Sequence, residues 1–510
     1  MQILLDRNKP VPLARQIQAH LERLMREGLL PSGAKLPATR ELADELGVNR
    51  ATVVLAYEEL VAAGLARARV GQGTFVAERP AERVAAEPAV ARRAATIEWS
   101  EIFSRTAQII GAEDERRRAS AGPTPAGNGV ISFAGGMPDS ALFPTDAFRR
   151  ALNEVIRREG EALLQYYPVA GYPPLRRYLS TYLLRFGLEA SPDEIMIVNG
   201  SQQGFDLIAR TLVDPGDVVA IEQPTYPRAM QVFRSFGAQL AAVPWDESGP
   251  RPEVFERVLE RHGPKLFYCQ PTCHNPTGLG MTVETGRRLL AAAARHQVPI
   301  VEDGFDGSLY YGLRPLGPLK SHDTDGVVIY IGTFSKILFP GLRLGWLVAP
   351  PPVIERLQAA KQLADLHTSA LIQAAVHCFC ERRLLDRHAA RVAREYRRRR
   401  EVLLGALKQR MPTSTTWTEP TGGFSLFLTL PEGVTAARLL PLALERGVAF
   451  TPGDVFFLNG SGSRALRLSF SSLPTGDIER GVQRLGEAVR EAQRRRPRSP
   501  LPERATVPVV

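Results

Sequence analysis

The sequence contains little cysteine and no long apolar run. Its four cysteines, Cys269, Cys273, Cys378 and Cys380, are scattered over 510 residues, which argues against a disulfide scaffold and suits a reducing compartment. No apolar stretch is long enough to span a bilayer, and the chain does not start with the positive and then apolar segment of a secretory signal. We therefore expect a cytoplasmic protein without membrane segments.

Metal-binding spacing is also lacking. Cys273 lies beside His274, but one neighbouring pair without a second cluster does not close a tetrahedral metal site, so we expect no metal. The net charge of +10 is concentrated in Arg397–Arg400 and in a basic tail with Arg494, Arg495, Arg496 and Arg498. This charge permits binding to a polyanion without proving it. We expect the two runs to be a solvated helix face and a frayed tail.

At this length the chain needs more than one compact core. Its first part combines short amphipathic helices with a glycine-bearing hairpin pattern, and a stretch rich in Ala, Arg, Pro and Gly follows. The longest part alternates β-rich apolar runs with helical stretches, which is typical of an α/β domain on a mainly parallel sheet. We predict a small helical unit over 1–78, a linker over 79–128 with a docking helix near 98–110, an α/β body over 129–492 and a mobile basic tail over 493–510.

The sequence pattern over residues 1–78 predicts three helices, with a tight turn between the second and the third. The first helix carries an apolar stripe formed by Leu13, Ile17, Leu21 and Leu24. The second follows Pro37, and Asn49 is well suited to cap a third helix from Arg50 to about Ala63. Val53, Tyr57 and Leu60 then face the core. This leaves Arg50 and Thr52 at the exposed end of the third helix, where a recognition helix meets DNA.

A strand, the turn Gly71-Gln72-Gly73 and another strand follow. The glycines permit a tight turn and close approach of the backbone to a phosphate. With the helices, this hairpin resembles the GntR-type winged helix-turn-helix, through Leu36-Pro-Ala-Thr-Arg-Glu-Leu-Ala43, Leu46-Gly-Val-Asn-Arg-Ala-Thr52 and Gly71-Gln-Gly-Thr-Phe-Val76. The resemblance implies a double-stranded DNA operator as partner. The DNA-contacting residues that it implies are Arg40, Arg50, Thr52, Gly71 and Gly73.

In the body, a lysine follows a predicted buried strand. The strand is Val327–Ile331, and Lys336 lies just beyond its carboxyl end, where ligands bind in open α/β sheets. Arg343 follows in Pro340-Gly-Leu-Arg-Leu-Gly345 and can return to the same pocket. A lysine that anchors an aldehyde and an arginine that clamps a phosphate are the groups that pyridoxal 5′-phosphate requires.

Other predicted strand ends supply further groups for this cofactor. Asp303 ends an apolar run and can pair with the pyridine nitrogen. Asn275 lies in an Asn-Pro-Thr-Gly turn and can donate to the ring hydroxyl, although a neutral turn explains that motif equally well alone. Tyr226 offers a ring for stacking. Gly200-Ser201-Gln202 opens a helix whose free N–H groups can hold phosphate.

These motifs, in this order, resemble the fold-type I aminotransferases over residues 129–492. The resemblance implies a large domain on a mainly parallel sheet, a smaller α/β domain, and catalysis by Lys336 and Asp303. Arg467 and Gly136 are implied to hold a ligand carboxylate, for which a planar arginine fork is suited; the alternative for Arg467 is a surface strand residue. The implied cofactor contacts are Lys336, Asp303, Asn275, Tyr226, Gly200, Ser201, Gln202, Ser335, Arg343 and Tyr166 of the partner subunit.

One position departs from the pattern. Related proteins carry a tyrosine shortly after the aspartate, but Asp303-Gly304-Phe305-Asp306 has phenylalanine there. We expect Asn275 to carry more of the contact to the ring hydroxyl, and efficient turnover to suffer more than cofactor binding. Tyr310 or Tyr311 is a candidate substitute.

A GntR-type reader, a linker and an aminotransferase-like body, in that order, resemble the MocR/GabR family of bacterial transcriptional regulators. This implies a homodimeric regulator that senses an amine-bearing effector or the cofactor itself, with two readers on paired half-sites. One alternative is a working aminotransferase, broad or 2-aminoadipate-like, that retains a DNA-binding extension. Another is a repressor of vitamin B6 metabolism that senses the cofactor alone.

Overall fold

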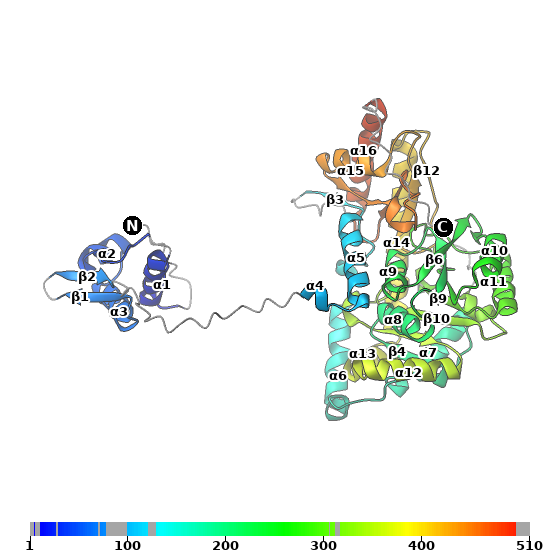
Figure 1. Cartoon of the computed structure of the whole chain (residues 1–510), viewed down its shortest axis with the longest axis horizontal. Coiled ribbons are helices and arrows are strands. Elements are labelled where there is room, and N and C mark those ends of the chain that lie inside the picture. The colour runs from blue at the N-terminus through cyan, green and yellow to red at the C-terminus, as the bar shows by residue number, and fades with distance from the viewer. Residues whose placement is uncertain are drawn as a thin grey trace. The chain divides into compact units, whose positions relative to one another are not determined.

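The computed structural model describes residue 5 and residues 11–26, 29–69, 72–77, 99–120, 129–304, 307–311 and 317–495. The chain forms two compact units, Met1–Ile102 and Phe103–Val510 (Figure 1). Gly71, Phe305 and the tail from residue 496 lie outside the described residues. Within the described ranges, every helix is too short or too polar to span a bilayer.

The first unit is a winged helix-turn-helix, as predicted. Its core consists of Ile17, Leu21, Leu42, Val53 and Leu60, each with no exposed surface. The hairpin strands pair antiparallel and form the wing. The elements are α1 (Leu13–Arg26), α2 (Thr39–Leu46), α3 (Arg50–Ala62), β1 (Ala66–Arg69) and β2 (Gly73–Val76), followed by the short α4 (Trp99–Ile102).

The turn between α2 and α3 follows from its residues. Gly47 ends α2 in the left-handed region with φ 61°, which glycine adopts without steric cost. Asn49 then caps α3, since its side-chain oxygen accepts from the N–H of Ala51 at 3.0 Å. Tyr57 ties α3 to the start of α2 by donating its hydroxyl to the carbonyl of Pro37 at 2.9 Å. This local bonding fixes how α3 presents its first residues.

The body is built on an eight-stranded sheet in the order β4-β11-β10-β9-β8-β5-β6-β7. The central pairs from β10 to β6 are parallel, whereas β11 runs antiparallel to both β10 and β4. The strands are β4 (Ile195–Val198), β5 (Val218–Gln223), β6 (Gln239–Asp246), β7 (Gly249–Pro250), β8 (Leu266–Cys269), β9 (Ile300–Asp303), β10 (Val328–Thr333) and β11 (Gly345–Val348).

Helices cover both faces of this sheet. Ile195 and Ile197 of β4 pack into one hydrophobic cluster, while Met196 and Val198 pack into another, so neighbouring residues of a strand face opposite layers. The helices of this large domain are α6 (Thr145–Leu163), α7 (Pro173–Leu183), α8 (Ser201–Leu212), α9 (Pro227–Ser235), α10 (Pro252–His262), α11 (Val283–His296), α12 (Pro351–Asp365) and α13 (Ala370–Glu381). Helix α5 (Arg105–Ser120) packs against α9.

A smaller α/β domain with its own core completes the body. It contains a four-stranded antiparallel sheet in the order β12-β13-β16-β15, and β14 pairs parallel with β3. Its elements are β3 (Ile131–Ser132), α14 (Leu384–Arg410), β12 (Thr416–Trp417), β13 (Ser425–Thr429), α15 (Ala436–Glu445), β14 (Val448–Ala449), β15 (Thr451–Pro452), β16 (Ala465–Ser469) and α16 (Thr475–Arg494). Short 3-10 helices lie at Ser140–Leu142, Leu184–Phe186, Pro192–Glu194, Gly307–Leu309, Leu319–His322, Pro340–Leu342 and Gly453–Phe456.

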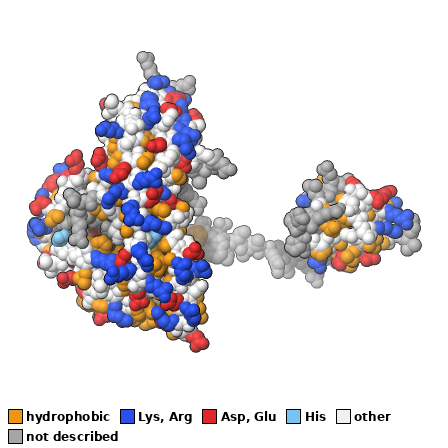
Figure 2. All heavy atoms as spheres, turned by 180° about the vertical axis from the view of Figure 1, so that it is seen from behind, with side chains coloured by type: hydrophobic (Ala, Val, Ile, Leu, Met, Phe, Trp, Pro, Cys, Tyr) orange, Lys and Arg blue, Asp and Glu red, His pale blue; other side chains and the backbone are white. Residues whose placement is uncertain are grey.

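The arginine run of α14 is only in part a solvated face. Basic and acidic side chains are interspersed over the face of the body in Figure 2, and Arg397 and Arg398 are exposed. Arg399, however, is 5% exposed and pairs with Asp139 at 2.7 Å and Glu395 at 2.9 Å. The expectation of a solvated run was wrong at this residue because consecutive residues point around the helix, and one of the four must face the packed side.

Candidate functional site

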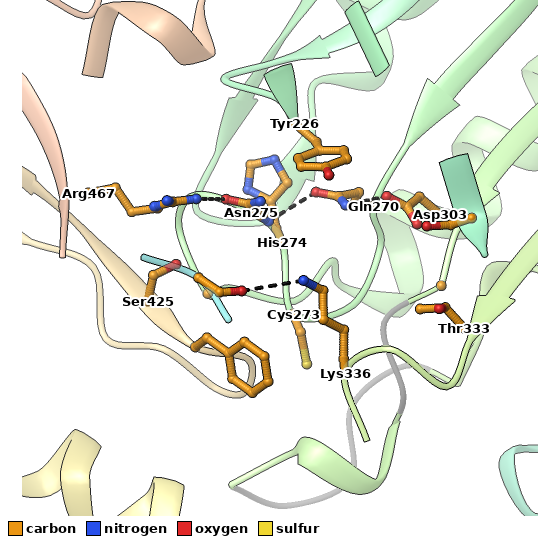
Figure 3. Close-up of a pocket in the computed structure, with 15 residues that line it drawn as sticks. Tyr226, Gln270, Cys273, His274, Asn275, Asp303, Thr333, Lys336, Ser425 and Arg467 are labelled. Atoms are coloured by element: carbon orange, nitrogen blue, oxygen red, sulfur yellow. Dashed lines mark hydrogen bonds between the residues drawn. The ribbon is translucent and has the colours of Figure 1, made fainter. Parts of the chain in front are cut away.

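A pocket lies at the carboxyl edge of the large sheet (Figure 3). Asp303 is the last residue of β9, and Lys336 follows β10. Tyr226 and Asn275 follow β5 and β8, whose carboxyl ends lie at the same edge because these strands are parallel. Arg467 reaches the pocket from β16 of the small domain. The fold therefore brings these five predicted residues together between two domains.

Lys336 is partly buried and lines the pocket. Its Nζ donates one hydrogen bond, to the carbonyl of Gly136 at 3.3 Å. Burial lowers the pKa of Lys336, and the positive charges of Arg467 and Arg343 act in the same direction, while Asp303 opposes them. A lowered pKa leaves more of the amine neutral and able to react with an aldehyde.

Asp303 is held on one side by two hydrogen bonds. The Tyr268 hydroxyl donates to Oδ2 at 2.8 Å, and the Gln270 amide donates to the same oxygen at 2.5 Å. Burial raises the pKa of Asp303 to about 6, although these two donors and Lys336 lower it. Because both donors bind Oδ2, the other carboxylate oxygen, Oδ1, is available to a positively charged partner such as a protonated ring nitrogen.

Gln270 and Tyr268 are site residues that the sequence patterns do not predict. Gln270 is 6% exposed, and its amide oxygen also accepts from the backbone N–H of Asn275 at 3.0 Å. It therefore links two predicted site residues. A polar side chain directly after a fully apolar strand was the available indication, since buried polar groups need partners.

Arg467 is a partly buried cation without a carboxylate partner among the described residues. Its Nη1 donates to the Asn275 side-chain oxygen at 3.0 Å, so the amide N–H₂ of Asn275 is turned away from the arginine. Nη2 donates to the carbonyls of Ala134 at 3.1 Å and Gly135 at 2.5 Å, and Nε has no partner. Burial lowers the pKa of Arg467 to about 10. Such an arginine is suited to an anionic ligand, and its position in the pocket disfavours the alternative of a surface strand residue.

The loop before α8 forms a cradle. Gly200 has φ 77°, and a side chain there would approach the Arg343 guanidinium to 2.7 Å. Arg343 precedes β11, whose amino end lies at the same edge because β11 is antiparallel to β10. Its Nη2 donates to the carbonyl of Asn199 at 3.1 Å. Ser201 lines the pocket and Ser335 is buried, while the Gln202 side chain is exposed.

A buried ion pair supports this loop from α12. Lys361 has no exposed surface and pairs with Asp365 at 2.7 Å. Lys361 also donates to the Gln203 side-chain oxygen at 3.0 Å, and Gln203 donates to Asp365 at 2.7 Å. The pair thereby fixes the first turn of α8.

The structure places two tyrosines differently, of which Tyr226 is predicted to stack on the cofactor ring and Tyr166 to reach the phosphate from the partner subunit. Tyr226 lines the pocket, and burial raises its pKa. Tyr166 does not line the pocket of its own chain: it is 82% exposed, with an edge-on contact to the His367 ring at 6.0 Å between centroids. A contact from the partner subunit stays a prediction.

Protein contacts hold the ring of His274 on one face and at both nitrogens. Its ring stacks on Trp245 with centroids 4.1 Å apart, Nδ1 contacts the Thr277 hydroxyl at 2.7 Å, and Nε2 contacts the Pro224 carbonyl at 3.0 Å. Over the described part of the chain, no group of three or more His, Cys, Asp or Glu side chains is arranged to hold a metal.

The first unit presents a second candidate interface. Arg40 of α2 and Arg50 at the start of α3 are exposed, and Thr52 is partly exposed in the same first turn. Nε of Arg50 donates to the Thr39 hydroxyl at 3.4 Å. Gly73 of the wing has φ 111°, and a side chain there would approach Lys35 to 2.9 Å, so glycine also makes room for a neighbouring cation.

Comparisons with known proteins agree with this geometry. Residues 129–485 match the family "Aminotransferase class I and II", and residues 13–76 match "Bacterial regulatory proteins, gntR family". The body thus belongs to the pyridoxal phosphate-dependent transferases of fold type I. The whole chain belongs to the MocR/GabR type of regulators, in which a GntR domain precedes such a body.

Similar proteins include full-length relatives. The chain is 32% identical to the uncharacterized HTH-type transcriptional regulator YisV of Bacillus subtilis, over 95% of this chain and 97% of that protein. It is 31% identical to the probable rhizopine catabolism regulatory protein MocR of Rhizobium meliloti, over 95% of each. The crystal structure of the α-aminoadipate aminotransferase LysN of Thermus thermophilus, complexed with N-(5′-phosphopyridoxyl)-L-leucine, shares 37% identity and a TM-score of 0.71, and covers 78% of this chain and all of that one.

Family and geometry together identify pyridoxal phosphate as the cofactor. Among the described residues, the pocket offers a partly buried lysine, a carboxylate with one oxygen left for a ligand, and a buried arginine nitrogen without a partner, and the adjoining loop before α8 offers a glycine cradle beside an arginine. These features fit an aldehyde, a ring nitrogen, a phosphate and a ligand carboxylate.

Proposed function

We propose that this protein is a DNA-binding transcriptional regulator whose body binds pyridoxal phosphate and senses an amine-bearing effector or the cofactor itself. One observation carries the proposal: a single chain combines a GntR-type reader that exposes Arg40 and Arg50 with a pocket that suits the cofactor. Residues 1–78 would be the reader, 79–128 the linker, 129–492 the body and 493–510 a basic tail. A regulator of this kind would act where the DNA lies, which is the cytoplasm of a bacterial cell.

The cofactor supplies an aldehyde and an electron-withdrawing ring when bound. Lys336 would hold the aldehyde through Nζ. Asp303 would keep a proton on the ring nitrogen, Asn275 would donate its amide to the ring oxygen, and Tyr226 would stack on the ring. The phosphate-binding residues in this proposal are Gly200, Ser201, Gln202, Ser335, Arg343 and Tyr166 of the partner subunit.

A homodimer is part of the proposal. Tyr166 is highly exposed in one chain, as expected for a side chain that serves a second copy, and two readers would address paired half-sites. The reader contacts would come from Arg40, Arg50, Thr52, Gly71 and Gly73.

The effector would bind between Lys336 and Arg467. The effector amine would lie beside Lys336, at the aldehyde of the cofactor, and its carboxylate would pair with Arg467 beside Gly136, where the neutral carbonyl of Gly135 now accepts the hydrogen bond. To regulate, the ligand must favour one state of the body by a few kcal/mol.

DNA footprinting upstream of the protein's own gene tests the proposal. We expect a protected palindrome or repeat whose occupancy changes when cofactor plus an amine, or cofactor alone, is added. A change with cofactor alone would identify the cofactor as the sensed molecule. Protection that none of the additions alters would refute a sensing role.

A second candidate function is an aminotransferase with a retained DNA-binding extension. It is favoured by the match of the body to all of the LysN chain. Rapid multiple turnover with an amino acid and 2-oxoglutarate, without specific binding to upstream DNA, would decide for this alternative.

A further inference from the structure

One segment of the small domain accepts hydrogen bonds from both cationic side chains of the pocket, Lys336 and Arg467. This cover segment, Phe133–Asp139, follows β3 and passes beside Arg467 and Lys336. The carbonyls of Ala134 and Gly135 accept from Arg467, and the carbonyl of Gly136 accepts from Lys336. A ligand carboxylate needs the same Arg467 donors, and a ligand amine must reach the position beside Lys336 that this segment adjoins.

Neutral carbonyls are weak substitutes for a carboxylate. Charge-assisted hydrogen bonds are roughly twice as strong as neutral ones, and Arg467 is partly buried with no carboxylate partner among the described residues. A ligand carboxylate therefore has a favourable exchange available. The contacts that hold the cover segment in place oppose this replacement of the backbone carbonyls by a ligand carboxylate.

The cover segment is fixed at its first end by backbone pairing. The N–H of Phe133 donates to the Ala449 carbonyl at 2.8 Å, and the Phe133 carbonyl accepts from the N–H of Ser469 at 2.9 Å. The first bond continues the pairing of β3 with β14, and the second joins the segment to the end of β16.

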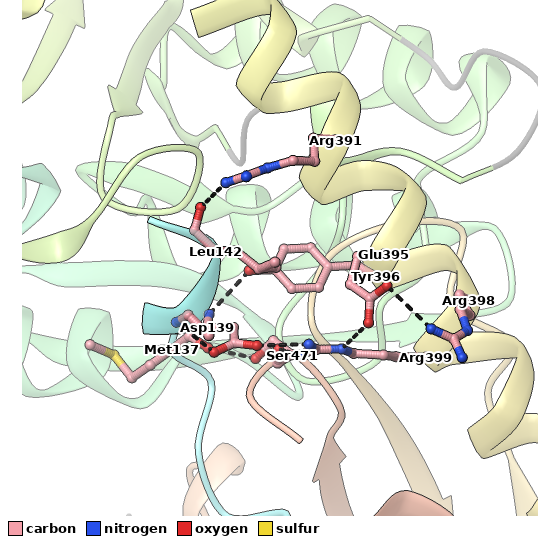
Figure 4. A network of polar contacts seen from close by, with 10 residues as sticks. Met137, Asp139, Leu142, Arg391, Glu395, Tyr396, Arg398, Arg399 and Ser471 are labelled. Carbon is pink, nitrogen blue, oxygen red and sulfur yellow. Dashed lines mark hydrogen bonds and ion pairs between the residues drawn. The ribbon is translucent and has the colours of Figure 1, made fainter. Parts of the chain in front are cut away.

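Arg399 fixes the other end from α14, as Figure 4 shows. Its guanidinium pairs with Asp139 at 2.7 Å and donates to the Ser471 carbonyl. The hydroxyl of Ser471 donates to the Met137 carbonyl at 2.6 Å, and the backbone N–H of Asp139 donates to the Tyr396 hydroxyl at 3.1 Å. Arg399 thus holds the segment both directly and through Ser471.

We propose that Arg399 and Asp139 are positioning residues that set the affinity for the effector carboxylate without touching it. Their ion pair keeps the carbonyls of Ala134 and Gly135 hydrogen-bonded to Arg467. A ligand carboxylate must therefore displace these two carbonyls. This inference rests on the proposed function, because it needs a carboxylate ligand at Arg467. Weakening the anchor makes displacement easier and tightens ligand binding.

The test uses the full-length, cofactor-bearing protein with Arg399→Lys and Asp139→Asn, each close in size to the residue it replaces. Glycine serves as the probe that has both an amine and a carboxylate, and methylamine as the probe that has the amine alone. Binding is followed by the change in cofactor absorbance, and acetate is titrated as a competitor of glycine. We expect Kd for glycine and acetate to fall about threefold to tenfold in both variants, and Kd for methylamine to change less.

Hydrogen exchange supplies a readout that needs no ligand. Both variants should speed amide exchange within residues 134–139 while the melting temperature changes little. Arg176→Lys is the matched control, because Arg176 also pairs with an aspartate, Asp193 at 3.0 Å, and with backbone carbonyls. It should change neither exchange in the cover segment nor ligand affinity.

The outcomes separate the two proposals. Faster exchange with unchanged or weaker glycine and acetate binding would show that the segment does not compete with the ligand. Unchanged exchange would show that Arg399 is not its anchor. If neither carboxylate bound the unaltered protein, or if Arg467→Ala bound them equally well, the proposed ligand site itself would be refuted.

Discussion

The DNA-binding unit and the body assemble their functional residues over very different lengths of chain. In the first unit, Arg40, Arg50 and Thr52 lie on two successive helices joined by one turn. In the body, Arg467 donates to the carbonyl of Gly135, 332 residues away. Caps and a turn fix the first arrangement locally, whereas sheet topology and domain packing fix the second. The two units should therefore fold independently of each other.

The largest effect is expected from Lys336→Ala. Removal of the amine abolishes the covalent bond to the cofactor, so the yellow absorbance of the purified protein should disappear. Binding of the unliganded protein to DNA should persist, because the reader is a separate unit. Lys408→Ala, on the exposed surface of α14, is the control. A yellow band that survives in Lys336→Ala would remove this lysine from its assigned role.

Leu21→Ala should unfold the reader alone. Leu21 is fully buried in the small first core, and loss of such a side chain costs about 2–5 kcal/mol. Specific DNA binding should be lost at moderate temperature while cofactor absorbance stays normal. Two separate transitions in calorimetry would support this, and Val61→Ala, at a more exposed position of α3, should leave both unchanged. Simultaneous loss of the cofactor would contradict independence.

Arg50→Ala should weaken operator binding by about 1–3 kcal/mol if this arginine contacts a base, and should relax sequence preference at one position. Titration of operator and scrambled DNA by fluorescence anisotropy measures both effects. Arg23→Ala on α1 is the comparison. An equal loss of affinity for scrambled DNA would instead assign Arg50 to a phosphate.

Cofactor affinity should depend on pH through Asp303. Burial raises the pKa of this carboxyl to about 6, and a protonated ring nitrogen favours the ionised form. Affinity should therefore fall as the pH drops below about 6, by at most roughly tenfold per pH unit. Stability without cofactor has the opposite sign: the raised pKa contributes stability that is present below about pH 4 and lost as the pH rises through about 6. Asp303→Asn should remove the pH dependence of cofactor affinity near pH 6. An unchanged dependence in this variant would assign it to other groups.

The smallest effect is expected from Asn49→Ala. The lost cap of α3 should cost the first unit about 1 kcal/mol and leave the body unaffected. Thermal unfolding of the full-length protein resolves this if the two units melt separately. Asn49→Asp, which keeps an acceptor for the N–H of Ala51, should retain most of the stability.

The sequence predicted the helix-turn-helix closely, because its determinants are local. Asn49 caps the third helix as expected, and Val53, Tyr57 and Leu60 are buried. In the body, the same kind of pattern predicted which residues follow apolar strands. It did not predict Gln270 and Tyr268 as partners of Asp303, because their contacts depend on which strands lie side by side.

By itself, the sequence determined the two classes of domain, their order and the residue types at the strand ends, since hydrophobic periodicity and turn residues act over a few positions. Only the tertiary structure decided that Arg399, within a run of four arginines, turns inward to Asp139, and that backbone carbonyls cover Arg467. Those contacts join segments hundreds of residues apart. Their geometry follows from how the helices and sheets pack, which no local pattern encodes.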